Sequence, residues 1–130
     1  MTRQKQRKVV FQLVYSLNYQ GMEQKDSILE EFYRQQGIEE RIPYIDESFY
    51  GICEQWDAIN GMIDPALANW SMKRLSAVCL AILRLAVYEV KFNPDIPDRV
   101  AINEAIELAK EFGDEDSGSF VHGVLSAIAK

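Results

Sequence analysis

Apolar residues recur at intervals of three and four along most of the chain, and this periodicity is the strongest constraint on its fold. The first apolar stripe lies within residues 3–20 and comprises Val9, Val10, Leu13, Val14 and Leu17. No segment alternates apolar and polar residues over the length of a strand. The pattern therefore predicts an all-α fold of about seven helices.

Glycines and prolines divide the chain between these stripes. Gly21 and Gly37 are typical helix stops, and Ser27 with Glu30 resembles a capping box. Pro43 and Pro65 are suited to the first position of a helix, where a missing N–H costs nothing. Helices are predicted over about residues 3–20, 27–36, 43–60, 65–70, 76–91, 97–112 and 117–129.

The chain has 130 residues, which is the size of one domain with a single core. The segment 76–91 is apolar on nearly every side, so we expect it to be the central helix. The two prolines of residues 93–97 predict a rigid turn, but the loops are too short to separate independent domains. We expect one domain, 1–130, built from two small packed helical bundles of about residues 1–62 and 63–130.

The start of the chain is basic although the whole chain is acidic, with a net charge of −6. Four of the 14 bases and none of the 20 acids lie in residues 1–22: the bases are Arg3, Lys5, Arg7 and Lys8. An acidic protein repels nucleic acid, so a phosphate-binding surface has to be local. Basic residues also oppose the dipole of a helix that begins there. The segment is either a phosphate-binding site or a basic helix end without function.

Few residues are suited to metal or catalytic chemistry. His122 is the only histidine, and Cys53 and Cys79 form no zinc-binding pattern. Both cysteines lie in apolar helical stripes, which predicts buried free thiols and fits a reducing cytosol. Glu104, Glu107 and Glu111 share one helix face without Glu-x-x-His pairs, so a solvated acidic face is favoured over a di-metal site. We therefore expect no metal and no cofactor, and a catalytic site is hard to build from these residues. The apolar run that stops at Arg84 is too short to span a membrane.

Longer segments carry a resemblance to a known family. The opening TRQKQRKVVFQLVYSLNYQG, and the later segments AILRLAVYE, VAINEAIELAKEFG and FVHGVL, are similar to the NusB family of antitermination factors. The resemblance implies an all-α, non-enzymatic, cytoplasmic bacterial protein. It also implies binding of boxA RNA together with the ribosomal protein NusE, within a complex of RNA polymerase and other Nus factors. The expected outcome is antitermination, chiefly in ribosomal RNA synthesis.

The resemblance also implies which residues bind RNA: Arg3, Lys5, Arg7, Lys8, Gln12, Tyr15, Asp116, Phe120 and His122. We expect Arg3, Lys5 and Arg7 to be exposed. Tyr15 and Phe120 are either base-stacking or core residues. Asp116 either caps its helix or faces RNA, where it repels phosphate or accepts a hydrogen bond from a base. His122 stands where the family usually has asparagine, and its imidazole keeps a capacity to form hydrogen bonds.

The expected partner interface contains Tyr15, Cys79 and Leu80. The family often has two charged residues where this chain has Cys79 and Leu80. Two apolar residues there favour either a more hydrophobic surface for NusE or a patch for self-association, and a homodimer is one possibility. The alternative function is therefore a self-associating protein–protein adaptor of the same fold with weak RNA binding.

Overall fold

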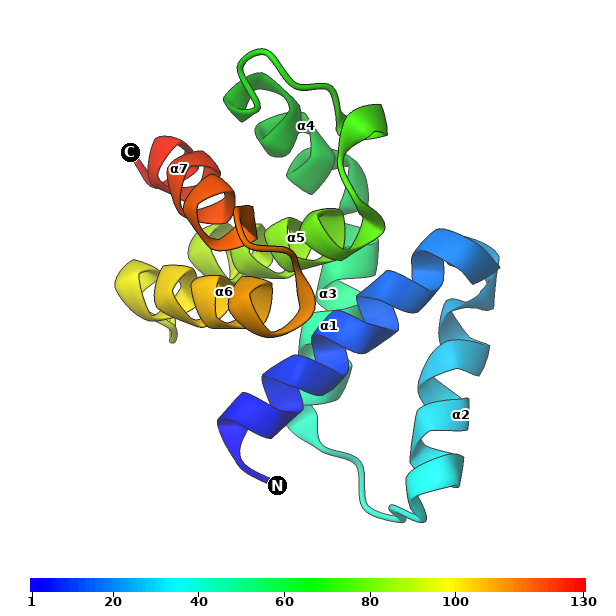
Figure 1. The fold of residues 1–130 in the computed structure, drawn as a ribbon. Helices are drawn as coiled ribbons and strands as arrows, with labels where there is room; N and C mark the ends of the chain where they lie inside the picture. Colours follow the sequence, from blue (N-terminus) through cyan, green and yellow to red (C-terminus); the bar gives the residue numbers. More distant parts are fainter.

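The computed structural model describes residues 1–130 and contains helices without any β-strand (Figure 1). The helices, with two short 3-10 helices labelled η, are α1 (Arg3–Gln20), η1 (Met22–Gln24), α2 (Lys25–Gln36), α3 (Pro43–Glu54), α4 (Trp56–Ala66), η2 (Met72–Arg74), α5 (Ala77–Phe92), α6 (Asp98–Phe112) and α7 (Ser117–Ala129). The predicted all-α fold is confirmed. No helix combines the length and the hydropathy needed to cross a membrane.

Local signals in the sequence explain where most helices begin and end. The Thr2 hydroxyl accepts a hydrogen bond from the Lys5 N–H at 3.2 Å, which caps the start of α1. Gly21 follows the end of α1 with a φ of 90°, and its N–H donates to the Leu17 carbonyl at 2.9 Å. Gly37 ends α2 in the left-handed conformation, as its position predicted.

The predicted start of α2 was wrong. Ser27 lies inside the first turn of α2 and caps nothing, since the helix begins at Lys25. The 3-10 helix η1 runs directly into α2, and the Lys25 N–H donates to the Met22 carbonyl. This continuous turn replaces the capping box.

The segment 43–70 also departs from prediction. Residues 43–60 form two helices, because the backbone turns at Gln55, where φ is −96° and ψ is 17°. Pro65 lies in the last turn of α4 and opens no helix of its own. The turn at Gln55 directs α4 against α5 and α7, where Ile59 and Ile63 are fully buried.

Helix α5 is central, as predicted, and packs against α1, α3, α4, α6 and α7 (Figure 1). One contiguous hydrophobic cluster joins all these helices and includes Val14, Phe49, Leu83 and Val124. Helix α4 spans residue 62, where the boundary between two bundles was expected. The division into bundles of about residues 1–62 and 63–130 stays a prediction.

Candidate nucleic-acid interface

The basic residues at the start of α1 differ in exposure. Arg3 and Lys5 are exposed, as predicted, and neither pairs with a carboxylate. Lys8 is partly exposed. Arg7 is only 4% exposed, so the prediction of an exposed Arg7 was wrong. Arg7 is buried because it pairs with Glu89, a buried acid on the central helix α5.

Arg7 and Glu89 form an ion pair between α1 and α5. The Arg7 Nε donates to both Glu89 carboxylate oxygens at 3.1 Å. The hydroxyl of the buried Tyr44, on α3, donates to Glu89 Oε2. Burial and the negative charge of Glu89 both raise the pKa of Tyr44, which keeps its hydroxyl protonated as a donor. These three side chains hold the start of α1 against α3 and α5.

Arg3 lies on the same side of α1 as Arg7, four residues earlier. Its guanidinium carbon is 4.2 Å from the centroid of the Tyr44 ring, and that of Arg7 is 5.7 Å away. The contact with Tyr44 orients Arg3 without neutralising it. Arg3 and Lys5 are therefore the two cations of this helix end that remain free to bind an anion.

Carboxylates of α6 lie opposite α1. Lys8 Nζ is 2.9 Å from a Glu111 carboxylate oxygen, and Arg7 Nη1 is 3.8 Å from Glu104 Oε2. A groove of about 370 Å³ runs between the two helices. The predicted solvated acidic face holds for Glu107 and Glu111, whose side chains are 67% and 49% exposed, whereas the Glu104 side chain is 24% exposed beside α1. Glu107 contacts Lys110 of its own helix at 3.5 Å.

Gln12 and Tyr15 lie further along α1. Gln12 is exposed and borders a shallow groove between α1 and α2. Tyr15 is half-buried against the hydrophobic core, and its hydroxyl shares a hydrogen bond with the Tyr19 hydroxyl at 3.0 Å. Tyr15 is thus both a packing residue and a surface residue, so either expected role is sterically available to it.

The start of α7 contributes Asp116 and Phe120. The Asp116 carboxylate is exposed and caps no helix N–H, so the capping interpretation was wrong. Asp114 organises this turn instead: its Oδ1 accepts from the Asp116 N–H at 3.2 Å and from the Ser117 hydroxyl at 2.9 Å. Phe120 is half-buried, and its ring centroid is 6.3 Å from that of Trp70 in an edge-on contact.

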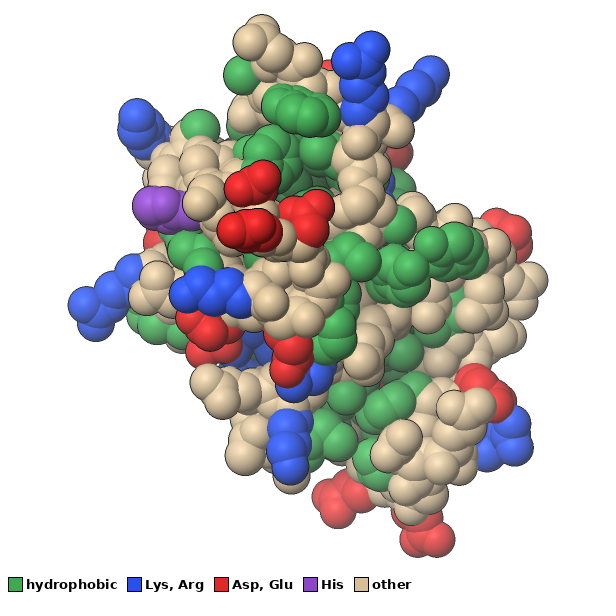
Figure 2. Space-filling model, in the orientation of Figure 1, with side chains coloured by type: hydrophobic (Ala, Val, Ile, Leu, Met, Phe, Trp, Pro, Cys, Tyr) green, Lys and Arg blue, Asp and Glu red, His purple; other side chains and the backbone are tan.

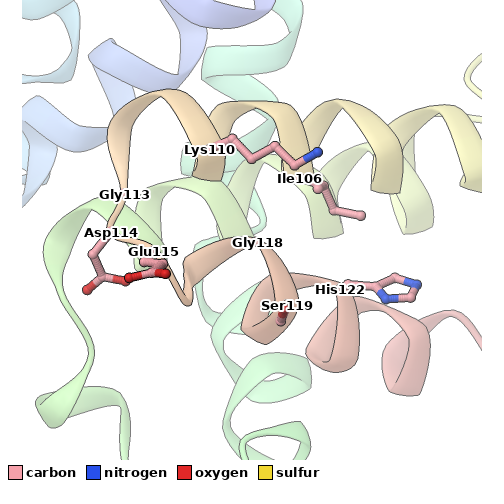
Figure 3. A pocket seen from close by; sticks show the side chains of 8 residues that line it. All are labelled: Ile106, Lys110, Gly113, Asp114, Glu115, Gly118, Ser119 and His122. Atoms are coloured by element: carbon pink, nitrogen blue, oxygen red, sulfur yellow. The ribbon is translucent and has the colours of Figure 1, made fainter.

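His122 does not join Phe120. Two residues along a helix correspond to about 200° of rotation, so the two side chains leave α7 in opposite directions. His122 borders a separate open groove of about 490 Å³ between α6 and α7, together with Lys110 and Ser119 (Figure 3). The structure therefore places His122 apart from the other predicted RNA-binding residues.

Cys79 and Leu80 are each 8% exposed. The expectation of an exposed apolar patch was wrong, because both side chains are covered where α5 begins. The Cys79 thiol lies 3.7 Å from the Ser117 hydroxyl of α7. Cys53 is also buried, so both cysteines are the buried free thiols that the sequence predicted.

Charge is unevenly distributed over the face of the molecule that carries the turn between α6 and α7. Figure 2 shows acidic side chains gathered over the turn between α6 and α7, beside exposed apolar side chains. Asp114, Glu115 and Asp116 are the exposed acids of that turn. Two of these acids, Asp114 and Asp116, line the same groove as the aromatic pair Trp70–Phe120.

Comparisons with known proteins agree with this architecture. Residues 4–130 match the model of the NusB family. The chain is 41% identical over 132 residues to "Transcription antitermination protein NusB" of Agathobacter rectalis, covering 99% of this chain and 100% of that protein. The corresponding protein of Bacillus pumilus is 40% identical over 128 residues, covering 98% of this chain and 95% of its own.

Two solved structures are similar over nearly the whole chain. The structure of T. maritima NusB matches with a TM-score of 0.90 and 38% identity, over 99% of this chain and 91% of that one. A second match is a chain in the crystal structure of antitermination factors NusB and NusE in complex with dsRNA. It has a TM-score of 0.85 and 26% identity, and the match covers 99% of this chain and 98% of that chain. The chain described here therefore belongs to the NusB family.

Proposed function

We propose that this protein is a non-enzymatic transcription antitermination factor. It binds boxA-type single-stranded RNA together with the NusE ribosomal protein, chiefly during ribosomal RNA transcription in the bacterial cytoplasm. RNA polymerase and other Nus factors complete the complex. Family membership supports this proposal, since curated relatives are named transcription antitermination proteins.

One observation carries the RNA-binding part of the proposal: Arg3 and Lys5 are exposed and unpaired in a chain whose net charge is −6. Free cations attract a phosphate backbone, whereas the acidic remainder of the surface repels it. The first turn of α1 therefore offers a local site for a nucleic-acid backbone.

The remaining predicted residues divide into different roles. Lys8 contributes once an RNA phosphate displaces Glu111 from it. Gln12 and Tyr15 supply a hydrogen-bonding group and an aromatic ring on the same helix, and Phe120 supplies an aromatic ring on α7. Asp116 faces solvent near Phe120 and limits how closely phosphates approach. Arg7 positions α1 instead of binding RNA.

The binding of a boxA-type RNA, measured with and without NusE, tests the proposal. We expect NusE to raise the affinity, and scrambling of the RNA sequence to lower it. The same affinity for boxA-type and scrambled RNA, with or without NusE, would exclude this function. The alternative of a self-associating adaptor has less support, because Cys79 and Leu80 are buried and form no patch.

A further inference from the structure

A groove of about 350 Å³ lies between η2 and the start of α7. Trp70 and Phe120 provide its aromatic surface, and Leu75 and Cys79 add apolar atoms. Trp70 is 55% exposed, which is unusual for the largest apolar side chain in a protein that has a well-formed core. The exposed indole needs an explanation other than core packing.

The groove is polar on both sides. Arg74 borders it from η2, and neither Arg74 nor its exposed neighbour Lys73 pairs with a carboxylate. Asp114 and Asp116 border it from the start of α7. A ligand carrying one anionic group and one flat aromatic group would therefore bind in a single orientation. Its anion would lie beside Arg74, away from the aspartates, with its ring over the indole.

We propose that this groove binds one unpaired base of a single-stranded RNA, stacked on Trp70, with the adjoining phosphate beside Arg74. This inference rests on the proposed function and extends its RNA-contacting surface from Phe120 to Trp70 and Arg74. Exposed aromatic rings next to unpaired cations are the chemistry by which proteins bind single strands, because every base has a face that can stack. Phe120 contacts Trp70 in an edge-on arrangement, with an angle of 72° between the two rings.

Tryptophan fluorescence tests the proposal directly, since Trp56 and Trp70 are the only two tryptophans. In a Trp56→Phe variant, emission comes from Trp70 alone, and a boxA-type RNA is expected to quench it by stacking. In the matched Trp70→Phe variant, emission comes from Trp56, which lies 4.1 Å from the guanidinium carbon of Arg84. This emission is expected to remain unchanged.

Affinities measured by anisotropy of the labelled RNA complete the test. Trp70→Ala is expected to lower affinity at least about fivefold, the lower end of what loss of one stacking aromatic costs. Arg74→Ala is expected to lower it further than Arg99→Ala, which removes an exposed, unpaired cation from the start of α6. Thermal unfolding of each variant checks that the fold is kept.

Three outcomes would overturn the proposal. Unchanged Trp70 emission and unchanged affinity of Trp70→Ala, with RNA bound normally, would refute the groove while the proposed function stands. Loss of NusE affinity by Trp70→Ala without any change in RNA affinity would make the groove a protein-binding surface. If neither the protein nor its mixture with NusE binds RNA, the proposed function fails as well.

Discussion

The Arg7 guanidinium of α1 and the Glu89 carboxylate of α5 form an ion pair in which the side chains are only 5% and 1% exposed. A residue in the basic opening of the chain is thus buried in the structure. The pair ties the helix end that carries Arg3 and Lys5 to the central helix. The orientation of the proposed RNA-binding cations therefore depends on a contact that is buried from solvent.

Replacement of Glu89 by Leu is expected to lower the free energy of unfolding by about 3–5 kcal/mol, because it removes the hydrogen-bonded carboxylate from a buried charge and leaves Arg7 only the Glu104 oxygen at 3.8 Å. Urea unfolding measures this loss. The double variant Arg7→Met with Glu89→Leu is expected to recover most of it, since apolar side chains of similar volume replace the whole pair. Arg99→Ala, at an exposed and unpaired cation of α6, serves as the control. A loss below about 1 kcal/mol in Glu89→Leu would show that the pair does not stabilise the fold.

Most of the fold was predictable because helix periodicity and helix stops are local properties. Gly21 and Gly37 end helices through their own backbone conformations, and α5 is buried because it is apolar on nearly every side. The turn at Gln55 was not predictable, because no glycine or proline marks it. It forms because α4 buries Ile59 and Ile63 against α5 and α7, which is a tertiary effect.

The exposure of the site residues was predictable from the sequence only for side chains that have no partner far away in the chain. Arg3 and Lys5 are exposed as expected, whereas the role of Arg7 depends on Glu89, 82 residues away. One signal was present: Arg7 extends the buried stripe of Val10, Phe11 and Val14 by one turn. A charge inside an apolar stripe indicates a buried ion pair. The pairing of Lys8 with Glu111 had no such local signal.

Glu111→Gln is expected to raise RNA affinity about two- to fivefold, because it removes the carboxylate that competes with phosphate for Lys8. This increase in affinity is modest because the ion pair between Lys8 and Glu111 is partly exposed, and such a pair contributes at most about 1 kcal/mol. Glu23→Gln makes the same charge change beyond the other end of α1. Equal affinities for the two variants would show that Glu111 does not restrain Lys8.

Leu80→Ala is expected to lower the free energy of unfolding by about 2–3 kcal/mol, since the side chain is 8% exposed. Val100→Ala removes an apolar side chain that is 36% exposed, and a change of no more than about 0.5 kcal/mol is expected. Urea unfolding of both variants gives the comparison. If Leu80→Ala impaired NusE binding while stability was unchanged, Leu80 would belong to an interface instead.

The burial of the Cys53 thiol leads us to predict that the protein loses stability at alkaline pH. Burial raises the pKa of Cys53 to about 11, from an ordinary value of 9.0. Between these values the unfolded thiol ionises while the folded thiol stays protonated, so the stabilising contribution present below pH 9.0 is lost as the pH rises toward 11. Urea unfolding of wild type and Cys53→Ala at pH 8 to 11 isolates this effect. A stability difference between the two proteins that stays constant with pH would argue against a buried, protonated thiol.

The central claim is that Arg3 and Lys5 bind the RNA backbone, and the salt dependence of binding tests it most directly. The affinity of boxA-type RNA, with NusE present, should be measured over a salt series for wild type and for Arg3→Ala with Lys5→Ala. For single strands, each phosphate contact contributes about −0.7 to the slope of log affinity against log salt. We predict that the double variant binds more weakly and that its slope is shallower by about 1.4, which corresponds to two lost contacts. An unchanged slope and affinity would contradict the account and place the RNA elsewhere on the protein.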